Sequence, residues 1–228
     1  MRLRMNRRQA LGALGAAAAV GTIGRPAIAD TKVTIGALRL TSHAPSYIAF
    51  ERGYFAEAGL DVEFAFFQAA QPMAVAIAAG DVDYGATAIS GGLISLAEKG
   101  AAKVIGGALT EEKGIEGQMI LASNDAHAAG LTSPAALAGR RYGVTTAGSS
   151  FHYMGAKVAA AEGIAESDLT FVPLQTVGAI IGALKTGQID AWSIVPNIAK
   201  GLVASGGAKS LGLIADYIPD YQVTTLMS

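Results

Sequence analysis

An internal repeat is the feature that most limits how this chain can fold. Residues 61–83 align with residues 168–190 without a gap, and each copy reads strand, Gln, helix, Gly-x-(Val or Ile)-Asp, strand. The identical pairs are Asp61/Asp168, Phe64/Phe171, Gln68/Gln175, Ala76/Ala183, Gly80/Gly187 and Asp83/Asp190. Apolar pairs such as Val82/Ile189 fall in register between them. The repeat predicts two lobes of one topology joined by a hinge, with the matched glutamines in equivalent geometry.

Short β-type runs alternate with helical runs through the first half of the chain. We expect strands at 32–38, 61–67, 83–88 and 102–110, and helices at 44–59, 72–80 and 91–100. Alternation at this spacing is typical of βαβ units, in which helices cover a mainly parallel sheet. The polar stretch 111–117 then interrupts the pattern and is the predicted interlobe crossover. The expected fold class is therefore α/β, with lobe one at 30–112 and lobe two with the hinge at 113–220.

The first 29 residues have the composition of a secretory leader. They contain five arginines and no acidic residue, then an apolar Gly/Ala-rich run at 11–23 that is too short to span a bilayer. The sequence Ala27-Ile28-Ala29 is a small-x-small cleavage site. Arg7-Arg8 favours twin-arginine export over general secretion. We expect cleavage after Ala29 and a periplasmic mature protein.

Composition excludes several classes of site. The chain has no cysteine, so it can form neither a disulfide nor a thiolate metal site. The residues after the leader are mildly acidic and show no basic patch, which argues against nucleic-acid binding. Three histidines, His43, His127 and His152, lie far apart without metal-ligand spacing. We therefore expect no metal and no cofactor.

Residues 42–64 contain Pro45, Gly53-Tyr54-Phe55 and Gly59-Leu60-Asp61-Val62-Glu63. Together with residues 76–88, 137–154 and 184–199, this segment resembles the periplasmic binding proteins of nitrate, sulfonate and taurine import systems, a superfamily that includes binders and synthases of the thiamine pyrimidine. Residues 42–64 are similar to the family's first helix and second strand. Residues 76–88 and 184–199 resemble two later segments of the family in which an aspartate closely follows a glycine. Residues 137–154 resemble the opening of its second lobe.

The resemblance implies a type II periplasmic-binding-protein fold and the solute-binding role of an ABC importer. The implied partners are a small-molecule solute and the permease and ATPase subunits in the inner membrane, with the binding protein itself a monomer. Mature chains of the family are longer, so the C-terminal part of lobe one is expected to be missing. Residues 221–228 read as the start of a strand that returns to lobe one.

Loops between strands and helices supply the candidate ligand-binding residues. Backbone N–H groups at helix N-termini suit an anion, and hydroxyl groups add donors without burying a charge. The candidates are Ser42, His43, Ala44, Gln68, Thr87, Ser90, Thr146, Gly148, Ser149, Ser150, His152 and Trp192. Structural alternatives stay open: Ser42 can cap a helix, His152 can face solvent and Trp192 can be an ordinary buried aromatic.

An enzyme is the competing reading, with Ser149 or Ser150 as nucleophile and His152 as base. A nucleophile elbow requires Gly-x-Ser-x-Gly, and in the motif that starts at Gly148 the fifth position is His152 instead of glycine. A relative of the thiamine-pyrimidine synthases would be expected to have a cysteine near the site, and the chain has none. We therefore expect no catalytic residue, with a thiamine-pyrimidine binder or related enzyme as the alternative function.

Overall fold

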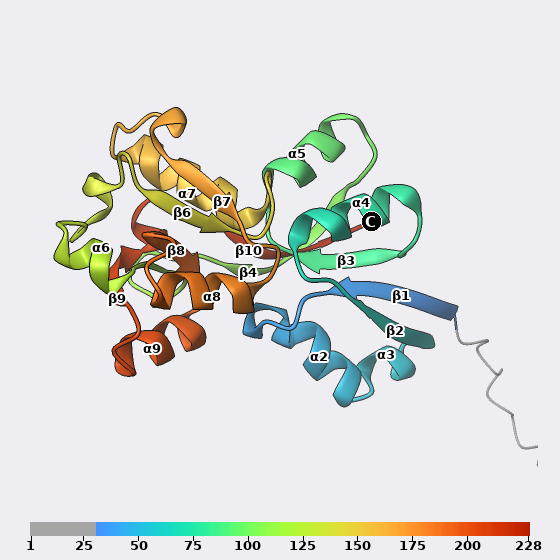
Figure 1. Ribbon diagram of the computed structural model, residues 1–228. Helices are drawn as coiled ribbons and strands as arrows, with labels where there is room; N and C mark the ends of the chain where they lie inside the picture. The colour runs from blue at the N-terminus through green and yellow to red at the C-terminus, as the bar shows by residue number, and fades with distance from the viewer. Residues whose placement is uncertain (1–30) are drawn as a thin grey trace, which may run out of the picture.

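The computed structural model describes residues 31–228, so the predicted leader at 1–29 lies outside the described residues. Figure 1 shows two α/β lobes side by side, each a sheet with helices packed against it. This confirms the predicted fold class, although both sheets are mixed. No helix among residues 31–228 is long and apolar enough to cross a membrane.

Lobe one contains a five-stranded sheet in the order β2-β1-β3-β10-β4. Its strands are β1 (Thr31–Ala37), β2 (Leu60–Phe66), β3 (Tyr84–Thr87), β4 (Val104–Thr110) and β10 (Gln222–Met227). Its helices are η1 (Thr41–His43), α2 (Ala44–Glu51), α3 (Tyr54–Glu57), α4 (Ala70–Ala79) and α5 (Gly91–Glu98). The first three strands are parallel, and β10 pairs antiparallel with both β3 and β4. Strand β10, which follows lobe two along the chain, thus inserts between β3 and β4 of lobe one.

Lobe two repeats this pattern in the order β7-β6-β8-β5-β9. Its strands are β5 (Met119–Ala122), β6 (Arg141–Val144), β7 (Thr170–Pro173), β8 (Ala191–Ile194) and β9 (Lys209–Leu213). Its helices are α6 (Asn124–Ala128), η2 (Pro134–Ala136), α7 (Ser150–Ala161), η3 (Glu166–Asp168), α8 (Val177–Lys185), α9 (Pro196–Ala204) and η4 (Ile214–Asp216). Strand β5 is antiparallel to β8 and β9, so it takes the place that β10 takes in lobe one.

The repeated aspartates perform one structural task in both lobes. Asp83 Oδ2 accepts from the backbone N–H of Thr34 at 2.8 Å, and Asp190 Oδ2 accepts from that of Arg141 at 2.7 Å. Each aspartate also donates its own N–H to the carbonyl of the same strand residue. The aspartate therefore fixes the turn that leads from each helix into the next strand.

Two local expectations were wrong. The helix expected at 44–59 is two helices, α2 and α3, because Gly53 adopts a left-handed φ of 76° between them. The matched glutamines are not in equivalent geometry, because Gln175 has a φ of 66° whereas Gln68 does not have a positive φ. Both follow a parallel strand of their sheet, but only the lobe-two strand ends in a left-handed turn.

Two crossovers connect the lobes and are hydrogen-bonded to each other. Residues 111–118 lead from β4 to β5, and residues 214–221 lead from β9 to β10. The Glu111 N–H donates to the Tyr221 carbonyl at 2.8 Å, and the Asp220 N–H donates to the Glu111 carbonyl at 2.9 Å. This paired double crossing lies where the sequence predicts the hinge, and its first crossover contains the predicted stretch 111–117.

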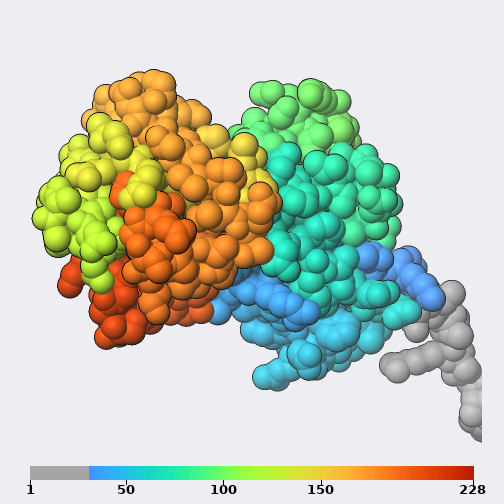
Figure 2. All heavy atoms as spheres, in the orientation of Figure 1, coloured from blue at the N-terminus to red at the C-terminus, as the bar shows by residue number. Residues whose placement is uncertain are grey.

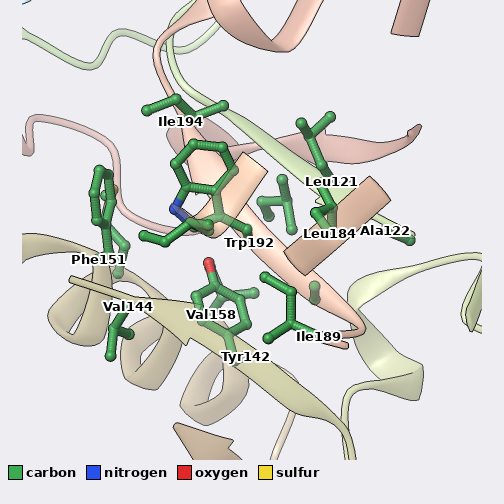
Figure 3. Packing of buried hydrophobic residues seen from close by; sticks show 14 of the residues in the cluster. Leu121, Ala122, Tyr142, Val144, Phe151, Val158, Leu184, Ile189, Trp192 and Ile194 are labelled. Atoms are coloured by element: carbon green, nitrogen blue, oxygen red, sulfur yellow. The ribbon is translucent and has the colours of Figure 1, made fainter. Parts of the chain in front are cut away.

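The cores of the two lobes differ in completeness. In lobe two, Trp192 and Tyr142 are fully buried, and Figure 3 shows them among packed side chains from α7, α8 and the sheet. In lobe one, an apolar cavity of about 500 Å³ lies against the sheet, lined by residues such as Ile35, Phe55 and Leu226. Among the described residues, this side of lobe one is thus only partly covered.

Candidate functional site

The two lobes meet at the loops that follow their parallel strands. Figure 2 shows the atoms of lobe two, in yellow and orange, in contact with those of lobe one, in blue and teal. The Gly92 N–H on α5 donates to the Gly148 carbonyl of lobe two at 3.1 Å. The Thr41 hydroxyl donates to Asn197 Oδ1 of lobe two at 2.9 Å. These direct hydrogen bonds between lobes describe a closed cleft.

A small cavity remains inside the closed cleft. Its volume is about 30 Å³, which is room for one or two water molecules. Its polar lining comes from both lobes and the hinge: Ser42, His43, Thr87, Gln118, Thr145 and Ser150. Four of the predicted site residues, Ser42, His43, Thr87 and Ser150, are therefore brought together, although they are far apart in the sequence. We call this space the inner cavity.

His43 presents an uncharged donor or acceptor to the inner cavity. The side chain is buried, its Nδ1 lies 3.1 Å from Ser42 Oγ and its Nε2 makes no hydrogen bond. Burial lowers the pKa of His43 to about 4, and the Ala86 backbone offsets this only in part. The imidazole is therefore neutral at pH 7, so this site offers hydrogen bonds and not a formal positive charge.

Helix N-termini also converge on the inner cavity. Ala69 and Ala70 at the start of α4 line it, and no side chain caps this helix. Ser150 and Phe151 at the start of α7 line it from the other lobe. The first N–H groups of a helix have no partner within the helix and carry the positive end of its dipole. The inner cavity is thus suited to a negatively charged or strongly dipolar group.

Two predicted site residues are helix caps instead of cavity residues. Ser90 Oγ accepts from the Leu93 N–H at 3.1 Å, and Ser149 Oγ accepts from the His152 N–H at 3.3 Å. Both serines are fully buried. Their hydroxyl oxygens accept hydrogen bonds from N–H groups in the first turns of α5 and α7, which is the structural role of an N-cap.

The loop before α7 is held by His152 from outside the inner cavity. The Gly148 N–H donates to His152 Nδ1 at 2.9 Å, and His152 Nε2 lies 3.1 Å from Glu166 Oε1. Both ring nitrogens are thus occupied, and neither bonds a serine hydroxyl. Gly148 has a φ of 72°, a conformation that glycine adopts without strain. Thr146 lies in the same loop, and its buried hydroxyl makes no hydrogen bond.

The remaining predicted residues lie at three different places. Trp192 is in the core of lobe two, with its ring edge-on to Phe151 at 5.6 Å, and does not line the inner cavity. Ala44 lies in a surface depression beside Tyr47 and Phe66. Gln68 lines a second and larger cavity between the lobes. None of the three lines the inner cavity, but Gln68 lies in the cleft between the lobes.

This second cavity, the outer chamber, has a volume of about 390 Å³. Leu38, Leu40 and Val177 line both spaces, so the chamber adjoins the inner cavity. Sequence reasoning did not select Gln118, Thr145 or the phenylalanines that line the two spaces. Thr145 directly follows β6, so the rule that loops after strands supply site residues could have found it, but Gln118 lies in a crossover whose path the sequence does not determine.

The serine and histidine pair considered from the sequence does not form. The Ser149 hydroxyl caps a helix, and both nitrogens of His152 are bonded elsewhere, whereas His43 Nδ1 lies 3.1 Å from the Ser42 hydroxyl. Residues 31–228 contain no group of three His, Asp or Glu side chains placed to hold a metal ion.

Comparisons with known proteins agree with this arrangement. A family model described as NMT1/THI5 like matches residues 40–228. No curated protein sequence matches the chain significantly.

Among solved structures, the alkanesulfonate-binding protein SsuA from Xanthomonas axonopodis pv. citri bound to MOPS has a TM-score of 0.67 at 21% identity, covering 87% of this chain and 65% of that one. The periplasmic aliphatic sulphonate binding protein SsuA from Escherichia coli has a TM-score of 0.63 at 19% identity, covering 86% of this chain and 61% of that one. The periplasmic nitrate-binding protein NrtA from Synechocystis PCC 6803 has a TM-score of 0.65 at 17% identity, covering 87% and 55%. The chain thus shares their fold and spans about two thirds or less of their length.

Proposed function

Because the chain belongs to the NMT1/THI5-like family, we propose that it is the solute-binding component of an ABC importer. It captures a small anion or small organic solute, of the nitrate, sulfonate or taurine kind, in the cleft between its lobes. The permease and ATPase subunits in the inner membrane then receive the solute. The leader-like residues 1–29 support export to the periplasm, with cleavage after Ala29.

One observation carries this proposal: donors from both lobes line one small enclosed cavity. Ser42, His43 and Thr87 approach it from lobe one, and Ser150 approaches it from lobe two at the start of α7. A solute held by both sets stabilises the closed arrangement over the open one, because only the closed arrangement supplies all of its contacts. This coupling of binding to lobe closure is what an import receptor requires.

The adjacent serines of α7 provide the sharpest test. Ser150→Ala removes a hydroxyl from the inner cavity and should weaken solute binding by about 1–3 kcal/mol while leaving the melting temperature of the protein without solute unchanged. Ser149→Ala is the matched control, because it removes a helix cap and should lower stability by about 1 kcal/mol. Isothermal titration calorimetry with nitrate, ethanesulfonate and taurine gives the affinities. Equal effects of both substitutions on affinity would contradict the proposed site.

A binder of the thiamine pyrimidine, or a related enzyme, is the second candidate function. The family match favours it, because the family description includes THI5. The neutral His43 is also suited to form a hydrogen bond with a heteroaromatic ring that carries no full charge. Titration with 4-amino-5-hydroxymethyl-2-methylpyrimidine separates the two: binding of the pyrimidine and none of the anions would replace the first proposal. Turnover of a precursor would make the protein an enzyme.

A further inference from the structure

We propose that the solute carries an apolar tail of about the size of one ring, and that the outer chamber beside Arg39 and Phe66 selects it. This rests on the proposed function, because it assigns the two adjacent spaces of the same cleft to the two ends of one solute. A polar or anionic head occupies the inner cavity, and the tail extends into the outer chamber.

The sizes of the two spaces require such a division. The inner cavity, at about 30 Å³, has room for a head group and not for a whole organic molecule. The outer chamber, at about 390 Å³, is within the range of ligand pockets in proteins. Leu38, Leu40 and Val177 line both, so the two spaces are adjacent, and the proposed solute extends past these three side chains from one space into the other.

Both lobes build the outer chamber, and most of its side chains are apolar. Phe66 and Phe67 at the end of β2 form one wall, and Val177 and Ile198 of lobe two form the opposite wall. Phe66 keeps 42% of its surface exposed although it lies between lobes that touch. Burying this surface against a ring would be favourable, at about 25 cal/mol per Å² of apolar area.

Arg39 gives the outer chamber a positive charge that is not neutralised by an ion pair among the described residues. Its Cζ lies 3.7 Å from the centre of the Phe66 ring, so the guanidinium stacks on an aromatic face. The charge attracts anionic solutes to the cleft, and the flat stacked pair presents a surface that matches a ring. A tail-less anion such as nitrate would leave this surface unused.

Two glycines on α8 make a matched pair of test variants. Gly178 lines the outer chamber, whereas Gly182 lies one turn further along the same helix and does not. A Cβ atom at either position meets nothing within 4 Å, so both accept a side chain. Leucine also favours helix over glycine, so neither Gly178→Leu nor Gly182→Leu should impair folding. Gly178→Leu fills the chamber, and Gly182→Leu leaves it open.

The experiment compares methanesulfonate with benzenesulfonate by calorimetry on the wild type and both variants. We expect the wild type to bind benzenesulfonate at least about tenfold more tightly, because the ring buries apolar area in the outer chamber. Gly178→Leu should abolish this preference and change methanesulfonate affinity by less than about twofold. Gly182→Leu should retain the preference in full. Phe66→Ala should reduce it from the other wall, with Phe50→Ala as its exposed control outside the chamber.

The outcomes separate this inference from the proposed function. Equal binding of the two sulfonates by the wild type, or a preference that survives in Gly178→Leu, would overturn the role of the outer chamber and leave solute binding intact. Binding of neither sulfonate would overturn the sulfonate form of the proposed function, and the inference would fail with it.

Discussion

The two lobes share a sheet pattern but differ in how completely they are packed. Lobe two is continuous in sequence and encloses Trp192 and Tyr142 without exposure. Lobe one joins its first four strands to β10 from the end of the chain, and a cavity of about 500 Å³ lies against its sheet. Asp83 and Asp190 make the same hydrogen bond in both. The two lobes thus share their strand order and the turns of the repeat, whereas the packing of their cores differs.

The largest expected effect tests packing with one chemical change in each lobe. Ile180 of lobe two is fully buried, whereas Ile35 of lobe one lines the apolar cavity. Ile180→Ala should cost about 4 kcal/mol of unfolding free energy and Ile35→Ala about 2 kcal/mol, because a residue beside a cavity has fewer contacts to lose. Urea unfolding followed by fluorescence gives both values. Equal losses would show that lobe one is as tightly packed as lobe two.

Much of the fold could be predicted because its signals are local. Strand and helix runs, Gly80 at the end of α4 and the repeated Asp83/Asp190 all depend on neighbouring residues. The site was harder, because Ser149 and Ser150 are adjacent and equivalent in sequence, yet one caps α7 and the other lines the inner cavity. The cap is a local hydrogen bond between Ser149 and His152, but the cavity beside Ser150 forms only where the other lobe approaches, through contacts such as Gly92 to Gly148. Trp192 was ambiguous because its burial depends on packing around Phe151.

The second largest expected effect is the pH dependence of stability that His43, a buried titratable residue of lobe one, produces. His43 has a pKa of about 4 when folded, against about 6.5 when unfolded. Between these values the unfolded chain binds more protons, so stability is complete above about pH 6.5 and falls as the pH is lowered toward 4. The full difference corresponds to about 3 kcal/mol. His43→Gln should remove this part of the pH dependence.

Urea unfolding of the wild type and His43→Gln at pH 7.5 and pH 4.5 measures this loss of stability on acidification. His127→Gln, at a histidine remote from the cleft on α6, is the control and should keep the wild-type pH dependence. If the wild type and His43→Gln lose the same stability between pH 7.5 and pH 4.5, His43 does not cause the pH dependence, and burial does not keep its imidazole neutral.

The smallest effect compares the two repeated aspartates directly. Asp190 bonds the backbone of Arg141 and also its guanidinium, with Arg141 Nη2 at 2.7 Å from Oδ1, whereas Asp83 bonds only the Thr34 backbone. Asp190→Ala should therefore cost about 2 kcal/mol and Asp83→Ala about 1 kcal/mol. Thermal unfolding of the two variants provides the comparison. A larger loss at Asp83 would mean that the ion pair with Arg141 contributes nothing to lobe two.

The position of β10 in the chain also determines which of the two sheets can form first. All strands of lobe two, from Met119 to Leu213, precede β10 along the chain, so lobe two can fold during synthesis while lobe one still lacks a strand. Until then β3 and β4 have no partner on the sides that β10 will fill, and unpaired strand edges promote aggregation. Thr225 must reach back to Thr87 across 138 residues, and contacts this distant form slowly. The slow phase of folding is therefore expected in lobe one, which is the first to be synthesised and the last to close.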